Sequence, residues 1–119
     1  MSHVLVGRPD GTEYAEYYSR YIERVPEEDL LPAVGNQLEV SLLLLRSISE
    51  EWAMSRYAPD KWTIKQLLGH IMDCERVFGF RAFWFARNSP IPLPGFDQDL
   101  FMSEVNFNRS VLGELGRAI

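Results

Sequence analysis

The segment 62–67 fixes the start of a long helix more firmly than any other part of the sequence. Thr63 fits an N-cap position and Gln66 follows three residues later, which is the pattern of a capping box. Apolar side chains then recur at helical spacing as far as about Asn88. The alternating prolines of segment 89–95 forbid helix there. The sequence therefore predicts a helix from Thr63 to Asn88, followed by an extended and stiff connector.

Three further segments carry helical periodicity, and no segment shows the alternation expected of a strand. The predicted helices cover residues 12–25, 32–54 and 97 to the end. Each carries an apolar stripe. In helix 12–25 the stripe is Tyr14, Tyr17, Tyr18 and Tyr21, and in helix 32–54 it is Leu38, Leu42, Leu45, Ile48 and Trp52. In the last helix it is Phe101, Val105, Leu112, Leu115 and Ile119. We therefore expect an all-α fold, with residues 1–119 forming a single domain.

Composition and charge exclude several classes of function. The 119 residues have a net charge of -5 and a pI near 5.0, which gives nucleic acid phosphates no generic attraction. The longest apolar run, 42–45, is too short to span a membrane, and the first residues lack a secretory pattern. The single cysteine, Cys74, cannot form an intramolecular disulfide. We expect a cytoplasmic protein that binds neither nucleic acid nor membranes.

The predicted helix 63–88 has apolar side chains on two faces. A helical projection places one arc toward the core, and a second strip lies on the far side of His70. The arc contains Ile64, Ile71, Cys74, Phe78, Ala82 and Phe85, and the strip contains Val77, Phe80 and Trp84. His70, with Arg81, falls at the edge of the arc. His70 is therefore predicted to lie in a seam between two buried surfaces, either as a structural histidine or as a ligand.

The polar neighbours of His70 also have two interpretations each. Asp73 could orient the imidazole ring or pair with Arg76 on the surface. Cys74 could be a small buried hydrophobe or a second donor beside His70. Glu75 projects toward the core arc, so it needs a partner, such as Arg81 or Arg87, or a catalytic role.

The segment 57–76 resembles the signature of the DinB-like superfamily, through Trp62-Thr63, Gly69-His70 and Asp73-x-Glu75. Arg81, Arg87 and the segment 93–97 continue the resemblance. It implies an up-down four-helix bundle with a divalent metal, often nickel or zinc, held by three histidines. The first of these matches His70. The other two come from a His-x-x-x-His pair on a fourth bundle helix, which these 119 residues do not reach, and the remaining histidine, His3, lies outside the matched positions.

Two functional hypotheses follow from the resemblance. In the first, the chain is a bundle that lacks its final helix and has an incomplete metal site, so that it is inactive or acts as a binding or structural module without a metal. In the second, another chain or a further C-terminal segment completes the site of a metal-dependent hydrolase or a low-molecular-weight-thiol transferase. His70 is then a metal ligand, lined by Asp73, Cys74, Glu75 and Arg81. In either case we expect a homodimer that buries Phe80, Trp84 and the last helix.

Overall fold

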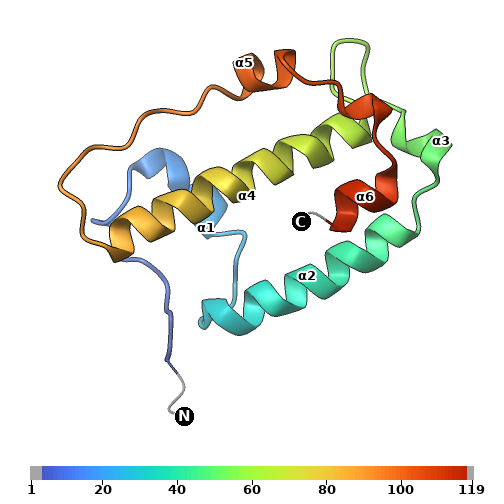
Figure 1. Ribbon diagram of the computed structural model, residues 1–119. Helices are drawn as coiled ribbons and strands as arrows, with labels where there is room; N and C mark the ends of the chain where they lie inside the picture. Colours follow the sequence, from blue (N-terminus) through green and yellow to red (C-terminus); the bar gives the residue numbers. More distant parts are fainter. Residues whose placement is uncertain (1–3, 118–119) are drawn as a thin grey trace. The chain divides into compact units, whose positions relative to one another are not determined.

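The computed structural model describes residues 4–117, and every regular element within that range is helical (Figure 1). The prediction of an all-α fold is confirmed. The elements are the 3-10 helix η1 (Glu16–Tyr18), α1 (Ser19–Ile22), α2 (Leu30–Arg46), α3 (Glu50–Ala53), α4 (Ile64–Ala86), α5 (Gln98–Ser103), the 3-10 helix η2 (Phe107–Arg109) and α6 (Leu112–Arg117). His3 and Ile119, which the sequence singled out, lie outside the described residues.

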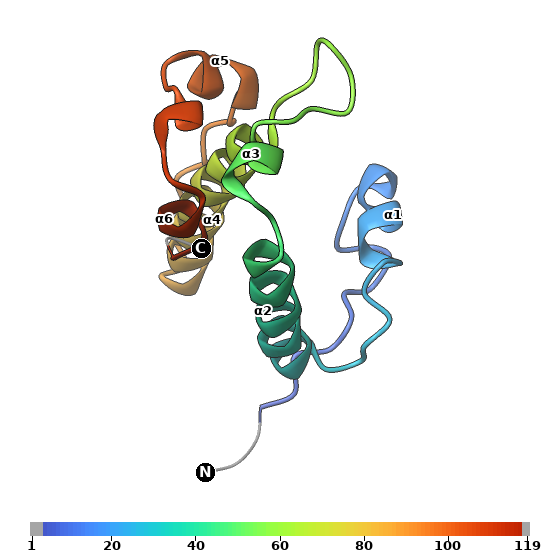
Figure 2. The ribbon, with the colours of Figure 1, turned by 90° about the vertical axis from the view of Figure 1, so that its right-hand side faces the viewer.

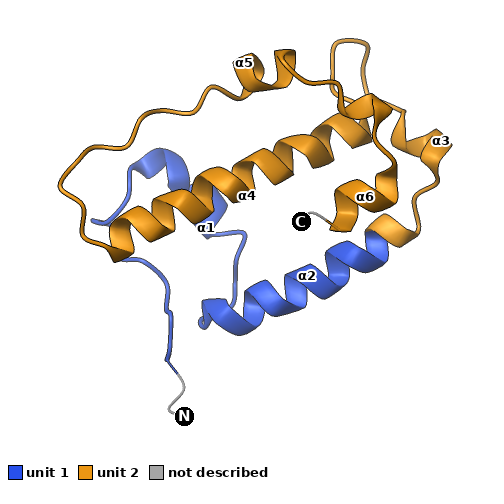
Figure 3. Cartoon of the chain, in the orientation of Figure 1, with its two compact units in different colours: residues 1–44 blue, residues 45–119 orange. Residues whose placement is uncertain are grey.

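The chain divides into two compact units, residues 1–44 and residues 45–119, with the boundary inside the last turn of α2 (Figure 3). The first unit contains η1, α1 and most of α2. The helix predicted over 12–25 is much shorter in the structure. The side chain of Asp10 accepts a hydrogen bond from the backbone N–H of Thr12 at 2.9 Å, and Glu13 accepts one from the N–H of Asp10 at 2.6 Å. These local bonds form a turn that competes with helix.

Two arginine side chains contact the region of α1 in the first unit. Arg8 donates to the carbonyl of Ile22 at 3.1 Å and to that of Val25 at 2.6 Å, which satisfies backbone acceptors where α1 ends. The guanidinium carbon of Arg20 lies 4.3 Å from the ring centroid of Tyr17. Of the predicted tyrosine stripe, Tyr17, Tyr18 and Tyr21 form an exposed cluster of rings.

The helix predicted over 32–54 is interrupted. Ser49 accepts a hydrogen bond from the N–H of Trp52 at 3.0 Å and so becomes the N-cap of a separate helix, α3. The interruption separates Trp52 from the apolar stripe of α2, and the Trp52 side chain is 57% exposed.

The long helix α4 begins as predicted. Thr63 Oγ1 accepts from the N–H of Gln66 at 3.1 Å, and Gln66 Oε1 accepts from the N–H of Thr63 at 2.8 Å, so the capping box is confirmed. The helix ends at Ala86, two residues before the predicted end, because Asn88 adopts a left-handed conformation with φ 51°. The connector that follows contains no helix, as predicted, and its Ile91 carbonyl accepts from the indole N–H of Trp84 at 2.7 Å.

The continuous last helix predicted from Asp97 onward is wrong, because three short elements replace it. Asp97 caps α5 by accepting from the N–H groups of Asp99 and Leu100, and Asn106 caps η2 by accepting from the N–H of Asn108. Each cap starts a new element, so the helical spacing of the apolar side chains does not continue across it.

The core of the second unit lies where α6 and η2 pack on the first half of α4, and α6 runs alongside α4 in two perpendicular views (Figures 1 and 2). Its buried members are Ala53, Leu68, Leu112 and Leu115, with Leu45, Ile48, Ile64, Ile71, Met72 and Phe107 packed around them. The predicted core arc of α4 is thus right at Ile64 and Ile71. It is wrong at Phe78 and Phe85, which are 58% and 70% exposed.

One carboxylate joins three helices of this unit. Glu50, in the first turn of α3, accepts from Lys65 Nζ of α4 at 2.7 Å through one oxygen. Through its other oxygen it accepts from the N–H of Leu112, in the first turn of α6, also at 2.7 Å. Lys65 is buried although it carries a charge, and Glu50 supplies the counterion that makes this burial tolerable. The backbone N–H of Leu112, which lacks an intrahelical partner, is satisfied by the same group.

Candidate functional site

The first turn of α4 is held firmly, and this fixes the direction in which His70 leaves the helix. The Thr63 side chain is fully buried. Its hydroxyl donates to Asn108 Oδ1 of η2 at 2.5 Å and accepts from the N–H of Gln66. Donor and acceptor are therefore both satisfied, as a buried hydroxyl requires.

The glycine of the Gly69-His70 pair has a structural reason. The Phe107 ring of η2 lies directly against the Gly69 backbone, so that a methyl group at this position would overlap the ring. A glycine here allows η2 to approach α4 closely. The next residue, His70, projects beside this contact and is half-buried.

Two aromatic rings from outside α4 surround the imidazole of His70. The Trp62 ring centroid lies 5.0 Å from that of His70, at an interplanar angle of 49°. The Phe96 ring is stacked at 6.4 Å and 5°, and it contacts Phe101 edge-on at 4.8 Å. His70 therefore lies half-buried in a seam, but not in the one predicted. The seam is formed by the residue before the N-cap of α4 and by the end of the connector, and not by two faces of α4.

Cys74 is the polar neighbour of His70, but its geometry is that of packing. Its Sγ lies 3.5 Å from Nε2 and 3.8 Å from Nδ1 of the imidazole. The lone pairs of the two nitrogens point away from each other in the ring plane. An atom almost equally distant from both nitrogens cannot lie along either direction. An ion held by Nε2 and Sγ together would place Sγ much farther from Nδ1 than from Nε2, so this arrangement does not form a two-residue chelate.

The thiol of Cys74 is not activated as a nucleophile. Partial burial raises the pKa of the Cys74 thiol above its ordinary value, and the negative charges of Asp73 and Glu75 raise it further. A reactive cysteine needs the opposite environment, in which positive charge stabilises the thiolate. The structure thus favours the interpretation of Cys74 as a small, partly buried hydrophobe.

The remaining candidate residues engage groups other than His70 or are exposed. Asp73 Oδ1 lies 3.7 Å from Nη1 of Arg76, which is the surface pair that the sequence allowed. Arg81 lies over the Phe78 ring at 5.9 Å. Within residues 4–117 no ion pair joins Glu75 to Arg81, and Glu75 is exposed, which corrects its predicted approach to the core. The reason is that the core formed by η2 and α6 against α4 reaches only as far as Met72, one turn before Glu75.

The residues present do not fit a three-histidine metal centre. The 119 residues contain two histidines, and His70 is the one that the structure describes. In the described part of the chain, no three side chains of His, Cys, Asp or Glu converge on a common point. Nor is any helix of that part long and apolar enough to cross a membrane.

A groove beside this site was missed by the sequence reasoning. It lies between the loop 54–62, the first turns of α4 and the start of α5, and it has a volume of about 780 Å³. Trp62 lines the groove and also contacts His70. The sequence signal that could have revealed it is the spacing of Trp52, Tyr57 and Trp62, three large aromatic residues around one polar loop.

The sequence was compared with known proteins. Residues 36–104, more than half of the chain, match the family model of the DinB superfamily, and this range includes His70 and Phe96. No curated protein and no solved structure matches the chain. The matched range contains the capping box of α4, the Gly-His pair and the connector, which are the features described above. This chain belongs to the DinB superfamily.

Proposed function

We propose that this chain is a helical binding or structural module of the DinB superfamily that holds no metal through its own residues and works as a homodimer. The observation that carries the proposal is the surroundings of His70. Its ring lies between Trp62 and Phe96, and the nearest sulfur, Cys74 Sγ, is beside the ring and not in front of a nitrogen. A tightly held zinc ion needs three or four protein donors.

In this proposal His70 is a packing residue. An imidazole combines a flat face, which suits the Trp62 and Phe96 rings, with two nitrogen atoms that can face water at the edge of a half-buried site. Because Phe96 ends the connector after α4, the stack also holds the connector near the beginning of the helix. Removing the ring should therefore loosen two segments at once.

The homodimer is supported by the second half of α4. Phe80 and Phe83, three residues apart on one face of α4, are 49% and 51% exposed, and exposed aromatic side chains on a common face are typical of an interaction surface. A two-fold dimer would bring the same surface of each copy together. Trp84, which the sequence assigned to this interface, is half-buried and bonded to Ile91, so Phe80 and Phe83 are the better candidates for its centre.

Elemental analysis of protein purified without chelator tests the absence of a metal centre. Wild type, His70→Ala and His70→Phe are compared. We expect background metal in all three, a lower Tm for His70→Ala, and a Tm close to wild type for His70→Phe, which keeps a ring between Trp62 and Phe96. A stoichiometric ion in wild type that both variants lose would contradict the proposal.

Mass measurement in solution by light scattering tests the dimer. Wild type is expected at twice the chain mass, and Phe80→Glu at the mass of one chain. Val40→Glu is the matched control, because Val40 is 65% exposed and lies on α2. A monomeric wild type at micromolar concentration would refute the dimer, and a dimeric Phe80→Glu variant would refute an interface centred on Phe80.

The alternative function is that of a metal-dependent hydrolase or a low-molecular-weight-thiol transferase in which another chain, or a further segment, completes a nickel or zinc site. The half-buried position of His70, at the place of the first ligand in the family, favours this alternative. Where a second copy of this chain completes the site, metal content depends on His70 and on dimer formation together. The two experiments above therefore separate the alternatives.

A further inference from the structure

The groove beside the start of α4 has walls that are fixed by the chain itself. The backbone N–H of Ile64 donates to the Ser55 carbonyl at 3.2 Å, and the N–H of Lys61 donates to the Ala58 carbonyl at 3.1 Å. Arg56 Nη1 donates to the Lys61 carbonyl at 3.0 Å. These bonds close the loop on itself, so a ligand would meet a largely pre-formed site.

One wall of the groove is apolar and aromatic. It is lined by Trp52, Trp62, Ile64 and Leu67, with Tyr57 at the rim. Trp52, on α3, is 57% exposed and Tyr57, on the loop that follows, is 85% exposed. Large aromatic side chains exposed on a concave surface are suited to bind a planar or apolar group.

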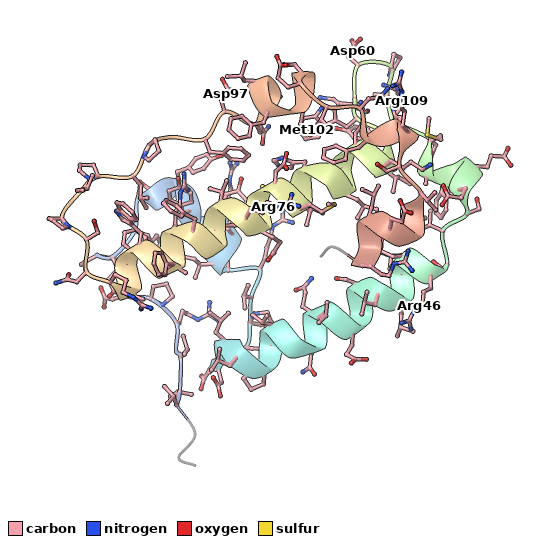
Figure 4. The ribbon with its side chains drawn as sticks, viewed as in Figure 1. Arg46, Asp60, Arg76, Asp97, Met102 and Arg109 are labelled. Carbon is pink, nitrogen blue, oxygen red and sulfur yellow. The ribbon has the colours of Figure 1, made fainter. Side chains whose placement is uncertain are left out.

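The polar lining of the groove carries both signs of charge. Arg56 and Lys61 supply two cations, and Asp60 and Asp99 supply two carboxylates. Asp60 lies at the tip of the loop between α3 and α4 (Figure 4). Asp99 lies in the first turn of α5. Asp60 and Lys61 are adjacent in the sequence, so the same loop brings both signs of charge to the groove. A guanidinium presents several donors and binds carboxylates well, whereas carboxylates bind an ammonium group.

We propose that this groove binds a zwitterionic small molecule with a planar apolar group, of the chemical class of the aromatic α-amino acids. The carboxylate of the ligand would meet Arg56 and Lys61, its ammonium group would meet Asp60 and Asp99, and its apolar group would lie against Trp52 and Trp62. A zwitterion complements both signs of charge in the lining, whereas a ligand with one charge complements only one of them. This inference goes beyond the proposed function, and its readout is ligand binding, not metal content or mass.

The three tryptophans of the chain provide an internal control in an NMR titration with L-phenylalanine as the probe. The indole N–H signals are assigned with the single variants Trp52→Phe, Trp62→Phe and Trp84→Phe. We expect the signals of Trp52 and Trp62 to shift saturably and that of Trp84, which is bonded to the Ile91 carbonyl, to stay in place. If no signal shifts, or if all three shift in parallel without saturation, the proposal is overturned.

Matched ligands and variants test the charge assignment. N-acetyl-L-phenylalanine lacks the ammonium group and L-phenylalaninamide lacks the carboxylate, and each should bind at least about tenfold more weakly than L-phenylalanine. Asp99→Asn and Arg56→Ala should each weaken L-phenylalanine binding by about tenfold. Arg76→Ala, a change midway along α4 and away from the groove lining, should leave binding unchanged (Figure 4). Equal binding of all three ligands, or no loss in Asp99→Asn, would refute the zwitterion.

Discussion

The hydroxyl of Thr63 donates a hydrogen bond to Asn108 Oδ1 across 45 positions of sequence, at 2.5 Å. The same oxygen caps α4 by accepting from the N–H of Gln66. A local signal that starts a helix is thereby also a tertiary contact with η2. The start of α4, which positions His70, is therefore sensitive to changes near residue 108 as well as to changes in the cap.

The first prediction concerns this double role of Thr63. Thr63→Val removes both hydrogen bonds while keeping the shape of the side chain, and leaves buried polar groups without partners. We expect it to lower the free energy of unfolding by about 1–3 kcal/mol. Thr63→Ser, which keeps the hydroxyl, should lose much less. Urea denaturation followed by circular dichroism measures both, and equal losses would show that the hydroxyl is unimportant.

The second prediction concerns the contact of Gly69 with Phe107. Gly69→Ala should destabilise the protein by about 1–3 kcal/mol, because the added methyl group overlaps the Phe107 ring. Gly79→Ala is the control: it adds the same methyl group to the same helix in open space, so stability should rise by up to about 1 kcal/mol.

A double variant distinguishes this clash from a general effect of alanine at position 69. Phe107→Ala removes the ring, so the loss caused by Gly69→Ala should be much smaller in that background. Additive losses would show that the ring is not what requires glycine.

The third prediction concerns pH. The Lys65 ammonium group, followed by the Leu112 N–H, holds the pKa of Glu50 below its ordinary value of 4.5. A carboxyl with a lowered pKa stabilises the fold above its ordinary pKa, and this contribution is lost as the pH falls through the lowered value. Glu50→Gln should therefore have a lower Tm than wild type at neutral pH, and the difference should shrink on acidification.

Glu51→Gln is the control for this pH series, since Glu51 is the exposed neighbour of Glu50 on α3. Thermal melts of the three proteins from neutral to acidic pH provide the measurement. A difference between wild type and Glu50→Gln that does not change with pH would contradict an ionic role for Glu50.

The fourth prediction concerns the thiol of Cys74. Because burial and the charges of Asp73 and Glu75 raise its pKa, alkylation by iodoacetamide should have its pH midpoint above the ordinary value of 9.0. Glu75→Gln should lower the midpoint, and the more distant change Glu104→Gln should not. A midpoint below the ordinary value would instead indicate a stabilised thiolate and would revive Cys74 as a nucleophile.

The parts of the fold that depend on local signals could be predicted from the sequence. The capping box of α4 and the proline connector are examples, since their hydrogen bonds and steric limits involve residues within a few positions. The break of the last helix also has local signals, in Asp97 and Asn106, although the apolar spacing of this segment predicts a continuous helix. Side-chain acceptors at caps compete with a continuing helix, and in this segment they prevailed.

The environment of His70 was predictable only in outline. A helical projection correctly gives a half-buried position, but it contains no information about residues beyond α4. Trp62 and Phe96 reach the imidazole from the loop before the helix and from the connector after it. The buried face of α4 was predicted only in its first half, at Ile64 and Ile71, because Phe107 and α6 determine which part of it is covered and neither belongs to the helix.

The ion pair of Glu50 with Lys65 and its hydrogen bond with the N–H of Leu112 determine when α4 can be packed while the chain is being synthesised. The cap of α4 can form as soon as Gln66 has left the ribosome. The N–H of Leu112 reaches Glu50 only after 62 further positions have followed that carboxylate. Until then Lys65 and Thr63 remain hydrated, and α4 is a helix without its packed layer. A nascent chain arrested before residue 108 should therefore be helical yet readily cut by proteases.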